Sequence, residues 1–352
     1  MNNLKALQIQ TQISKSLNYT PFDIRWLPYS TKVVVVGQTP SSKGIIQIYH
    51  LIKGKLELES EFKKENPFKC CSFGASSFVS RDLALGDFEG NFLIFDLEKG
   101  SSIYEIKKAH KSLIYTIDAV GGNLNYGTPE VVTGGKDGNV KIWDLRSDKP
   151  AITLEPKGIE NNCPECWSLA YGGCYNNEER NLGIGYDNGD IKIYDLRIDK
   201  PLYGENFKNG ICSIEFDRKN IPINKMVATT LDSKIYLFDL KTLDKNNNLI
   251  YEKLCDEVNN TTIWGTKFIP QRRDIFVSMG GNGTLNLYKY NNSDLIGNEL
   301  KREKRKLILL NNNLICSHPI IGFDWNNAKF GLSCLVAFDH TVKICSINKY
   351  NK

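Results

Sequence analysis

The sequence has no long apolar run. Stretches such as residues 33–36 and 307–310 are only four residues long, whereas a membrane-spanning helix needs about 20 apolar residues. The first residues, MNNLKALQ, also contain no apolar stretch of the length that a secretory signal peptide requires. We therefore expect neither a membrane protein nor a secreted one.

A strong excess of charge of either sign is absent too. The chain has 352 residues with 45 Lys and Arg against 40 Asp and Glu, so its net charge is +5. Proteins that bind nucleic acid usually gather more positive charge on one face, so this balance does not favour a nucleic-acid partner. Apolar residues make up 41% and charged residues 24%, a composition typical of a folded protein with a sizeable core.

The sequence also lacks a complete set of residues for catalysis or metal binding. Cys163 and Cys166 form a single C-x-x-C motif, with no second pair or histidines at the spacing of zinc ligands. The glycine-rich stretches at residues 134–138 and 280–283 do not match a phosphate-binding loop and are typical of hairpin turns. We therefore expect no enzymatic activity, no cofactor, no metal and no small-molecule substrate.

The ten cysteines are scattered along the chain. Four of them, Cys70, Cys71, Cys212 and Cys334, lie within apolar, strand-like runs. This pattern is typical of reduced thiols that pack as small apolar side chains inside the cell. We expect a cytoplasmic protein, with the nucleus as the alternative compartment.

The sequence does contain a repeat of about 50 residues. Each copy has a small or acidic turn, a β-rich run and an anchor residue that is usually aromatic and often followed by Asp-Leu. Alternation with period two indicates half-buried strands, and Asp-Gly or Asn-Gly turns close hairpins between them. Seven copies of four antiparallel strands predict an all-β, seven-bladed β-propeller formed by residues 1–352 as a single domain. Its anchors are Tyr49, Phe95, Trp143, Tyr194, Phe238, Tyr288 and Cys345.

The two ends of the chain predict how the ring closes. After the third strand of the seventh copy, at residues 344–347, only five residues remain, too few for a fourth strand. Residues 7–13, LQIQTQI, alternate like a strand and belong to no other copy. We expect this N-terminal strand to pair into the last blade and remove its open edge.

The third copy carries His110, Thr133, Asp137 and Trp143. These residues match the His–Ser/Thr–Asp–Trp set of the WD-repeat propeller family, whose repeats the third copy resembles. We interpret these four residues as a structural tetrad, a buried hydrogen-bond network that ties the strands of the blade together. A hydrolase triad is the weaker interpretation, because a buried hydroxyl on a strand cannot meet a substrate.

Six further stretches are distinctive: NYTPFD at 18–23, GDFEGN at 86–91, PEVVTG at 129–134, YNNEER at 175–180, GYDNGDIK at 185–192 and EFDRK at 215–219. They resemble corresponding stretches of one member of this family, an assembly factor for axonemal dynein. The resemblance implies a non-catalytic protein–protein interaction scaffold that acts as a co-chaperone-associated adaptor in the cytoplasmic preassembly of axonemal dynein arms. The implied partners are a complex of RuvB-like ATPases and prefoldin-like subunits, with dynein chains as clients, around a monomeric propeller. A link to apoptosis has also been described for that member.

Two other functions remain open. Trp143, Asp144 and Arg146 form a W-D-x-R box that resembles the one in substrate receptors of cullin-type ubiquitin ligases. The residues Tyr194, Asp195 and Arg197 repeat the pattern in the next copy. The second alternative function is that of a reader of modified peptides, such as methylated histone tails, since aromatic side chains can form a cage around a methylated lysine.

We predict that partners bind the face formed by the loops that lead into the innermost strands, where a rigid scaffold presents aromatic and charged groups. Tyr19, Phe22, Lys69, Trp167 and Trp264 are the candidate contact residues. The opposite face is expected to be a solvated rim of mixed charge, with Arg81, Arg180, Arg218, Lys219, Lys225, Arg272 and Arg273 interleaved with Glu178, Glu179 and Asp274. The basic run at residues 301–306 is interpreted as a solvated loop, with an acidic partner or a nuclear signal as alternatives.

Overall fold

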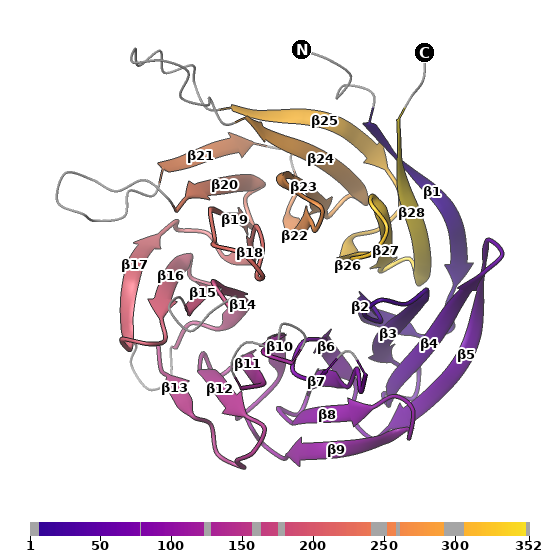
Figure 1. Cartoon of the computed structure of the whole chain (residues 1–352), viewed down its shortest axis with the longest axis horizontal. Coiled ribbons are helices and arrows are strands. Elements are labelled where there is room, and N and C mark those ends of the chain that lie inside the picture. Colours follow the sequence, from indigo (N-terminus) through magenta and orange to yellow (C-terminus); the bar gives the residue numbers. More distant parts are fainter. Residues whose placement is uncertain are drawn as a thin grey trace.

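The computed structural model is a ring of seven four-stranded antiparallel sheets, arranged as blades around a central channel (Figure 1). It describes residues 7–77, 79–122, 128–156, 163–174, 180–240, 252–257, 261–291 and 306–349. Within these ranges all regular structure is β-strand. The predicted all-β, seven-bladed propeller is confirmed.

In each blade the strands follow one another from the channel to the outer rim. The innermost strands of blades 1 to 7 are β2 (Thr20–Trp26), β6 (Phe68–Ser72), β10 (Ile114–Val120), β14 (Cys166–Gly172), β18 (Ile211–Phe216), β22 (Ile263–Ile269) and β26 (Ile320–Trp325). The second strands are β3 (Lys32–Gln38), β7 (Leu83–Asp87), β11 (Glu130–Gly135), β15 (Asn181–Tyr186), β19 (Lys225–Thr230), β23 (Arg272–Gly280) and β27 (Leu332–Ala337). The third strands are β4 (Gly44–Ile52), β8 (Phe92–Asp96), β12 (Val140–Asp144), β16 (Asp190–Asp195), β20 (Lys234–Asp239), β24 (Thr284–Asn291) and β28 (Thr341–Lys349). The outermost strands are β5 (Lys55–Lys64), β9 (Ser101–Ile106), β13 (Ile152–Leu154), β17 (Lys200–Asn206), β21 (Glu252–Glu257), β25 (Lys306–Leu314) and, in blade 7, β1 (Leu7–Ser16).

The second strands are apolar on both faces because each blade is covered by a neighbour on either side. In β3, Val33 and Val35 pack into the core shared with blade 7, whereas Val34 and Val36 pack into the core shared with blade 2. A strand that is buried on both faces carries a continuous apolar run rather than an alternating one. The run at residues 33–36 is therefore the signature of a strand inside the ring.

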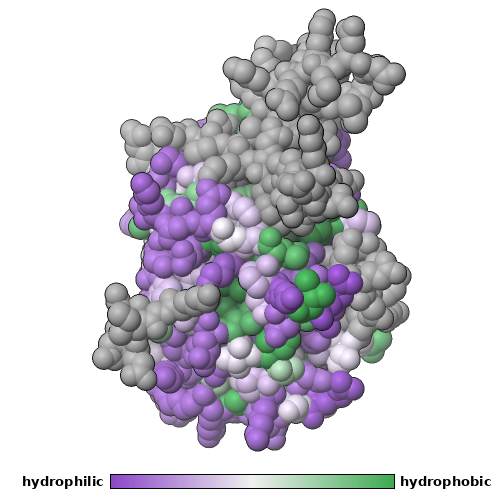
Figure 2. Space-filling view, turned by 90° about the vertical axis from the view of Figure 1, so that its left-hand side faces the viewer, coloured by the Kyte–Doolittle hydropathy of each residue, from purple (hydrophilic) through white to green (hydrophobic). Residues whose placement is uncertain are grey.

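The outermost strands have the opposite character. β5 alternates exposed charged residues with half-buried ones along most of its length. Seen from the side of β17, the coloured surface is mainly hydrophilic, with smaller hydrophobic areas towards the centre (Figure 2). Charged side chains on outer strands discourage edge-to-edge pairing with other chains.

The ring closes through the two ends of the chain. β1 pairs antiparallel with β28, with Leu7 opposite Lys349 and Ser16 opposite Thr341, so that the first strand completes the last blade. Ile9 of β1 is fully buried in the core between blades 6 and 7. The predicted closing strand is confirmed, and it extends three residues beyond its predicted end, to Ser16.

Candidate protein-binding site at the upper end of the channel

The innermost strand of every blade carries a β-bulge at the same position. In β2 the register with β3 shifts between Pro21 and Asp23, and the other six innermost strands shift at the corresponding place. A bulge leaves one residue without a partner across the ladder and re-aims its side chain. The seven bulge residues all line the channel, close to the end where the innermost strands begin, which we call its upper end. This mouth ring consists of Phe22, Lys69, Tyr115, Trp167, Cys212, Trp264 and Ile321.

Burial separates the mouth ring from the core. The residue before each bulge is buried in all seven blades, whereas the bulge residue itself is at least partly exposed. Trp264 is the most exposed of the seven mouth-ring residues, with 41% of its surface exposed. The bulges therefore present seven side chains to the channel from strands whose neighbouring residues hold the blades together.

Four of the five predicted contact residues belong to this ring, but they lie in the strands and not in the loops before them. The fifth, Tyr19, is wrong as a surface residue. It is 2% exposed and packs in the core between blades 1 and 7, beside Tyr49.

The sequence analysis missed Tyr115, Cys212 and Ile321. A pattern of apolar residue, variable residue and small residue recurs at all seven bulges, and aligning it identifies all three. Its small residue is Asp23, Cys70, Thr116, Ser168, Ser213, Gly265 or Gly322. Of the cysteines expected to be buried, Cys212 differs, because its bulge position leaves it half-buried at the channel.

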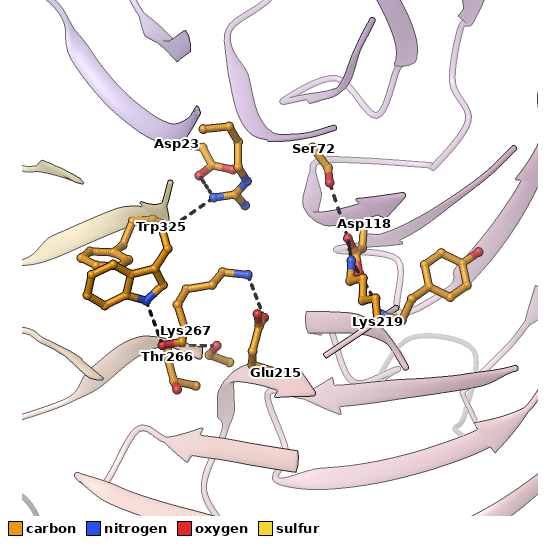
Figure 3. Close-up of polar contacts among 12 residues, drawn as sticks. Asp23, Ser72, Asp118, Glu215, Lys219, Thr266, Lys267 and Trp325 are labelled. Carbon is orange, nitrogen blue, oxygen red and sulfur yellow. Dashed lines mark hydrogen bonds and ion pairs between the residues drawn. The ribbon is translucent and has the colours of Figure 1, made fainter. Parts of the chain in front are cut away.

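A layer of ion pairs crosses the channel below the mouth ring (Figure 3). Arg25 Nη1 lies 2.9 Å from Asp23 Oδ1, and Lys267 Nζ lies 2.7 Å from Glu215 Oε2. Lys219 reaches into the channel and pairs with Asp118. Burial by itself would raise the pKa of Asp118, but the ammonium group of Lys219 and the amide of Tyr171 bring it below its usual range.

The acids of this layer also join neighbouring blades. Asp23 accepts a hydrogen bond from the Cys71 amide (3.0 Å), and Asp118 accepts one from the Tyr171 amide (2.9 Å). At four further junctions an inner-strand side chain bonds the backbone of the next or preceding blade: Cys70 to Ile114, Ser168 to Ile211, Ser213 to Thr266 and Trp325 to Lys267. Because these bonds occupy the carboxylates, we interpret the charged layer as part of the scaffold rather than as an acid–base centre.

Lys69 differs from the other cations that line the channel. Arg25, Lys219 and Lys267 face carboxylates, and Arg218 donates to Asn220 Oδ1. Among the described residues, no acceptor atom pairs with Lys69 Nζ, which lies 5.2 Å from the centre of the Phe22 ring. Burial lowers the pKa of Lys69, and the nearby charge of Asp23 only partly opposes this effect.

Next to Lys69 the mouth has an aromatic shelf, formed by Phe22, Phe88 and Phe338. The Phe22 ring lies 5.1 Å from the Phe88 ring and 6.4 Å from the Phe338 ring. Phe88 and Phe338 directly follow the second strands of blades 2 and 7. The amide of Phe88 donates to the carbonyl of Pro67, and the amide of Phe338 donates to the carbonyl of Pro319. Each proline directly precedes the innermost strand of the same blade. Phe338 is 40% exposed, so the shelf offers apolar surface to a partner.

The other side of the mouth is internally paired. Trp167 Nε1 donates to Glu165 Oε2 at 3.1 Å, and Lys136 Nζ lies 3.9 Å from Glu165 Oε1. The pKa of Tyr115 is raised by burial and by its hydrogen bond to Glu165. Glu165 is therefore already satisfied, in contrast to Lys69 across the mouth.

The tetrad of blade 3 forms one continuous chain of hydrogen bonds. Trp143 Nε1 donates to Thr133 Oγ1 (2.8 Å), Thr133 Oγ1 contacts His110 Nε2 (2.8 Å), and His110 Nδ1 contacts Asp137 Oδ1 (2.9 Å). Thr133 accepts from Trp143 and so has its own proton to donate to Nε2, which leaves the imidazole proton on Nδ1 facing Asp137. Both His110 and Thr133 are fully buried, so no substrate can reach them.

The W-D-x-R boxes lie at the lower ends of the third strands β12 and β16. Arg146 forms a two-point contact with Asp144, at 2.9 Å and 2.6 Å, and its side chain is 75% exposed. Arg197 contacts Asp195 at 3.1 Å in the same way. Trp143 is buried in the core, whereas Tyr194 donates to Asp199.

Two of the residues that were expected on the solvated rim of the opposite face lie elsewhere. Lys219 points into the channel, and Lys225 is only 3% exposed, with its ammonium group 4.4 Å from the centre of the Tyr290 ring. Other predicted members do form surface ion pairs, as in Arg272 with Asp274 and Arg180 with Glu130. Glu178, Glu179 and residues 301–305 lie outside the described residues.

Neither a metal site nor a membrane span is found in the described part of the chain. Its His, Cys, Asp and Glu side chains form no group of three or more that is arranged to hold a metal ion. Cys163 and Cys166 are among nine described cysteines, all of them free thiols. No helix in the described ranges is long and apolar enough to cross a membrane.

Comparison with known proteins gives two kinds of match. Residues 81–267 match the family model described as the nucleolar protein 10-like, N-terminal domain, a β-propeller. Over their full lengths, the chain and the dynein axonemal assembly factor 10 of Homo sapiens are 40% identical, as are the chain and that of Bos taurus. The protein of the same name from Chlamydomonas reinhardtii is 38% identical, with 98% of each chain covered.

Proposed function

The chain belongs to the dynein axonemal assembly factor 10 family, and from this premise we propose that it is a non-catalytic protein-interaction scaffold in the assembly of axonemal dynein. The mouth ring is the observation that carries the proposal. Seven bulges on a rigid ring present aromatic, aliphatic and basic side chains at one end of a channel of about 640 Å³. Clustered aromatic side chains on a rigid frame are typical anchors for protein partners.

The proposal has a finer part. We infer that the protein acts in the cytoplasm as an adaptor between dynein chains and a co-chaperone complex of RuvB-like ATPases and prefoldin-like subunits. The sequence resemblance supports these partners, and the full-length similarity to the assembly factors supports the client. The occupied carboxylates of the channel and the buried tetrad favour a scaffold over an enzyme.

The test compares two pairs of exposed apolar residues in the tagged full-length protein. Trp264→Ala with Phe338→Ala removes apolar surface at the mouth, whereas Leu58→Ala with Ile103→Ala removes similarly exposed residues from the outermost strands. Each protein is purified gently from its own cells, and its partners are identified by mass spectrometry. We expect the mouth variant to recover several-fold less dynein chain or co-chaperone subunit than the wild type, and the rim variant to match the wild type.

The proposal would be overturned if the wild type recovered neither dynein chains nor co-chaperone subunits. It would also be overturned if the rim variant lost these partners as strongly as the mouth variant does. Recovery of cullin components or histones in place of these partners would also contradict it and favour one of the two alternative functions.

A further inference from the structure

We propose that Lys69 and the aromatic shelf form a binding site for an acidic segment of a partner protein. In this site an Asp or Glu carboxylate of the partner meets the Lys69 ammonium group, and an adjacent apolar side chain lies on Phe22 and Phe338. The inference deepens the proposed function and rests on it, since it specifies the chemistry that the mouth recognises.

The unpaired ammonium group is the first argument. A lysine side chain offers three N–H donors and no acceptor, and among the described residues no protein acceptor meets the donors of the half-buried Lys69. The ring of Phe22 attracts the cation electrostatically but provides no acceptor atom. A carboxylate from outside would satisfy these donors with a charge-assisted hydrogen bond, which is roughly twice as strong as a neutral one.

The neighbouring acids cannot take this role from within. Asp23 is the nearest candidate, but its carboxylate already contacts Arg25 and accepts bonds from the amides of Ile24 and Cys71. Across the mouth, Glu165 is held by Trp167 and Lys136. Within the described residues the donors of Lys69 therefore remain available to a negative charge that a partner brings.

The aromatic shelf is the second argument, because it is independent of charge. Phe22 projects from a bulge in blade 1, while Phe88 and Phe338 come from the two flanking blades, so three blades build one apolar surface. Its Phe338 ring is as exposed as Trp264. A partner segment with an acidic residue followed by an apolar one would place its carboxylate at Lys69 and its apolar side chain on the adjacent aromatic shelf.

The shape of the channel limits how deep a partner can go. The pair of Arg25 and Asp23 lies directly below Phe22 on the same strand. A partner segment would therefore lie across the upper end and insert side chains only as far as the ion-pair layer. This geometry fits an extended peptide better than the end of a helix.

The experiment measures peptide affinity by fluorescence anisotropy with the full-length protein. The first probe is a fluorescein-labelled Gly-Asp-Phe-Glu-Leu-Asp-Gly amide, and the second is its neutral twin, Gly-Asn-Phe-Gln-Leu-Asn-Gly amide. We expect the wild type to bind the acidic probe about tenfold more tightly than the twin, as one charged hydrogen bond allows. We expect Lys69→Met to remove this preference and Lys69→Arg to retain most of it.

Lys111→Met is the matched control. Lys111 is an exposed lysine on the upper side of blade 3 that does not line the channel, so the variant loses the same charge from the same face. It should keep the preference for the acidic probe. Phe338→Ala should weaken both probes, because it removes apolar contact and leaves the charge of Lys69 in place.

Equal binding of the two probes by the wild type would overturn the inference, and so would an equal loss in Lys111→Met and Lys69→Met. The comparison of probes on the wild type requires no variant, so misfolding of a variant cannot obscure it. The two proposals fail separately. Partner recovery that survives in Lys69→Met leaves the scaffold function standing without the acidic site, whereas a wild type that recovers no partner refutes the scaffold function whatever the peptides show.

Discussion

The carboxylate of Asp324 accepts a hydrogen bond of 2.8 Å from the backbone amide of Trp26, which lies 298 residues earlier in the chain. This bond joins the innermost strands of blades 7 and 1, where the ring closes. It completes the series of side-chain to backbone bonds that link each blade to the next around the channel.

Asp324→Ala should therefore destabilise the ring. It leaves the buried amide of Trp26 without an acceptor, at an expected cost of about 1–3 kcal/mol in the free energy of unfolding. Asp324→Asn retains an oxygen acceptor and removes a carboxylate whose pKa is raised by burial, so its effect should be smaller. Urea unfolding of the two variants measures the difference, and equal stability of Asp324→Ala and the wild type would contradict the role of this bond.

Closure by β1 predicts a strong dependence on Ile9. This side chain is fully buried between blades 6 and 7, and Ile9→Ala should cost about 2–5 kcal/mol through lost contacts and a cavity. Gln12→Ala, an exposed position on the same strand, should change stability by less than about 0.5 kcal/mol. Thermal unfolding of both variants tests this, and similar melting temperatures would show that β1 adds little to the closed ring.

The tetrad predicts a specific pH dependence. Burial tends to raise the pKa of Asp137, but hydrogen bonds from His110 and from the amides of Lys111 and Asn139 lower it to about 2, against a usual value of 3.8. A folded-state pKa below the unfolded one stabilises the fold above about pH 4, and this stabilisation is lost as the pH falls towards 2. For this shift it amounts to about 2 kcal/mol.

The test compares the urea unfolding of Asp137→Asn and of the wild type between about pH 6 and about pH 2. This range includes the pH values, from about 4 down to about 2, over which the Asp137 carboxylate loses its stabilising effect. The stability gap between them should be largest above pH 4 and should narrow below it. Asp148→Asn is the control, because Asp148 is exposed in the turn that follows the same blade's third strand. A gap that stays constant with pH would show that the Asp137 carboxylate is not held by the tetrad.

The two arginine boxes should tolerate substitution. Arg146 is paired with Asp144 at the surface, where ion pairs contribute little, so Arg146→Ala with Arg197→Ala should leave the melting temperature nearly unchanged. Arg273→Ala is a useful contrast, since it removes the partner of the Asp217 carboxylate, whose side chain is fully buried, and should lower stability by about 1–3 kcal/mol. Differential scanning calorimetry distinguishes the two, and equal effects would contradict this assignment. The same double variant tests the ubiquitin-ligase alternative, which predicts loss of a bound cullin adaptor.

The architecture follows from the sequence alone. Alternating strands, Asp-Gly and Asn-Gly turns and anchors about 50 residues apart are local features, and they predict seven blades. The spare strand at the N-terminus predicts the closure by β1, because a last blade that lacks its outer strand has an unpaired edge. The partners of His110 could be named as well, since the tetrad residues all belong to one blade and one recognisable repeat.

Only the tertiary structure decides which side chains reach the channel mouth. Tyr19 and Phe22 are three residues apart and both aromatic, yet one fills a core between blades and the other projects from a bulge. A bulge depends on the register with the neighbouring strand, which the alternation of apolar residues does not contain, and the short motif that recurs at the bulges can be interpreted only once that register is known. Lys225 is likewise buried over Tyr290, although its charge suggests a solvated rim. The mouth ring joins residues from seven blades that are distant in sequence, so the position of Lys69 beside Phe22 and the adjoining aromatic shelf exist only once the ring has closed.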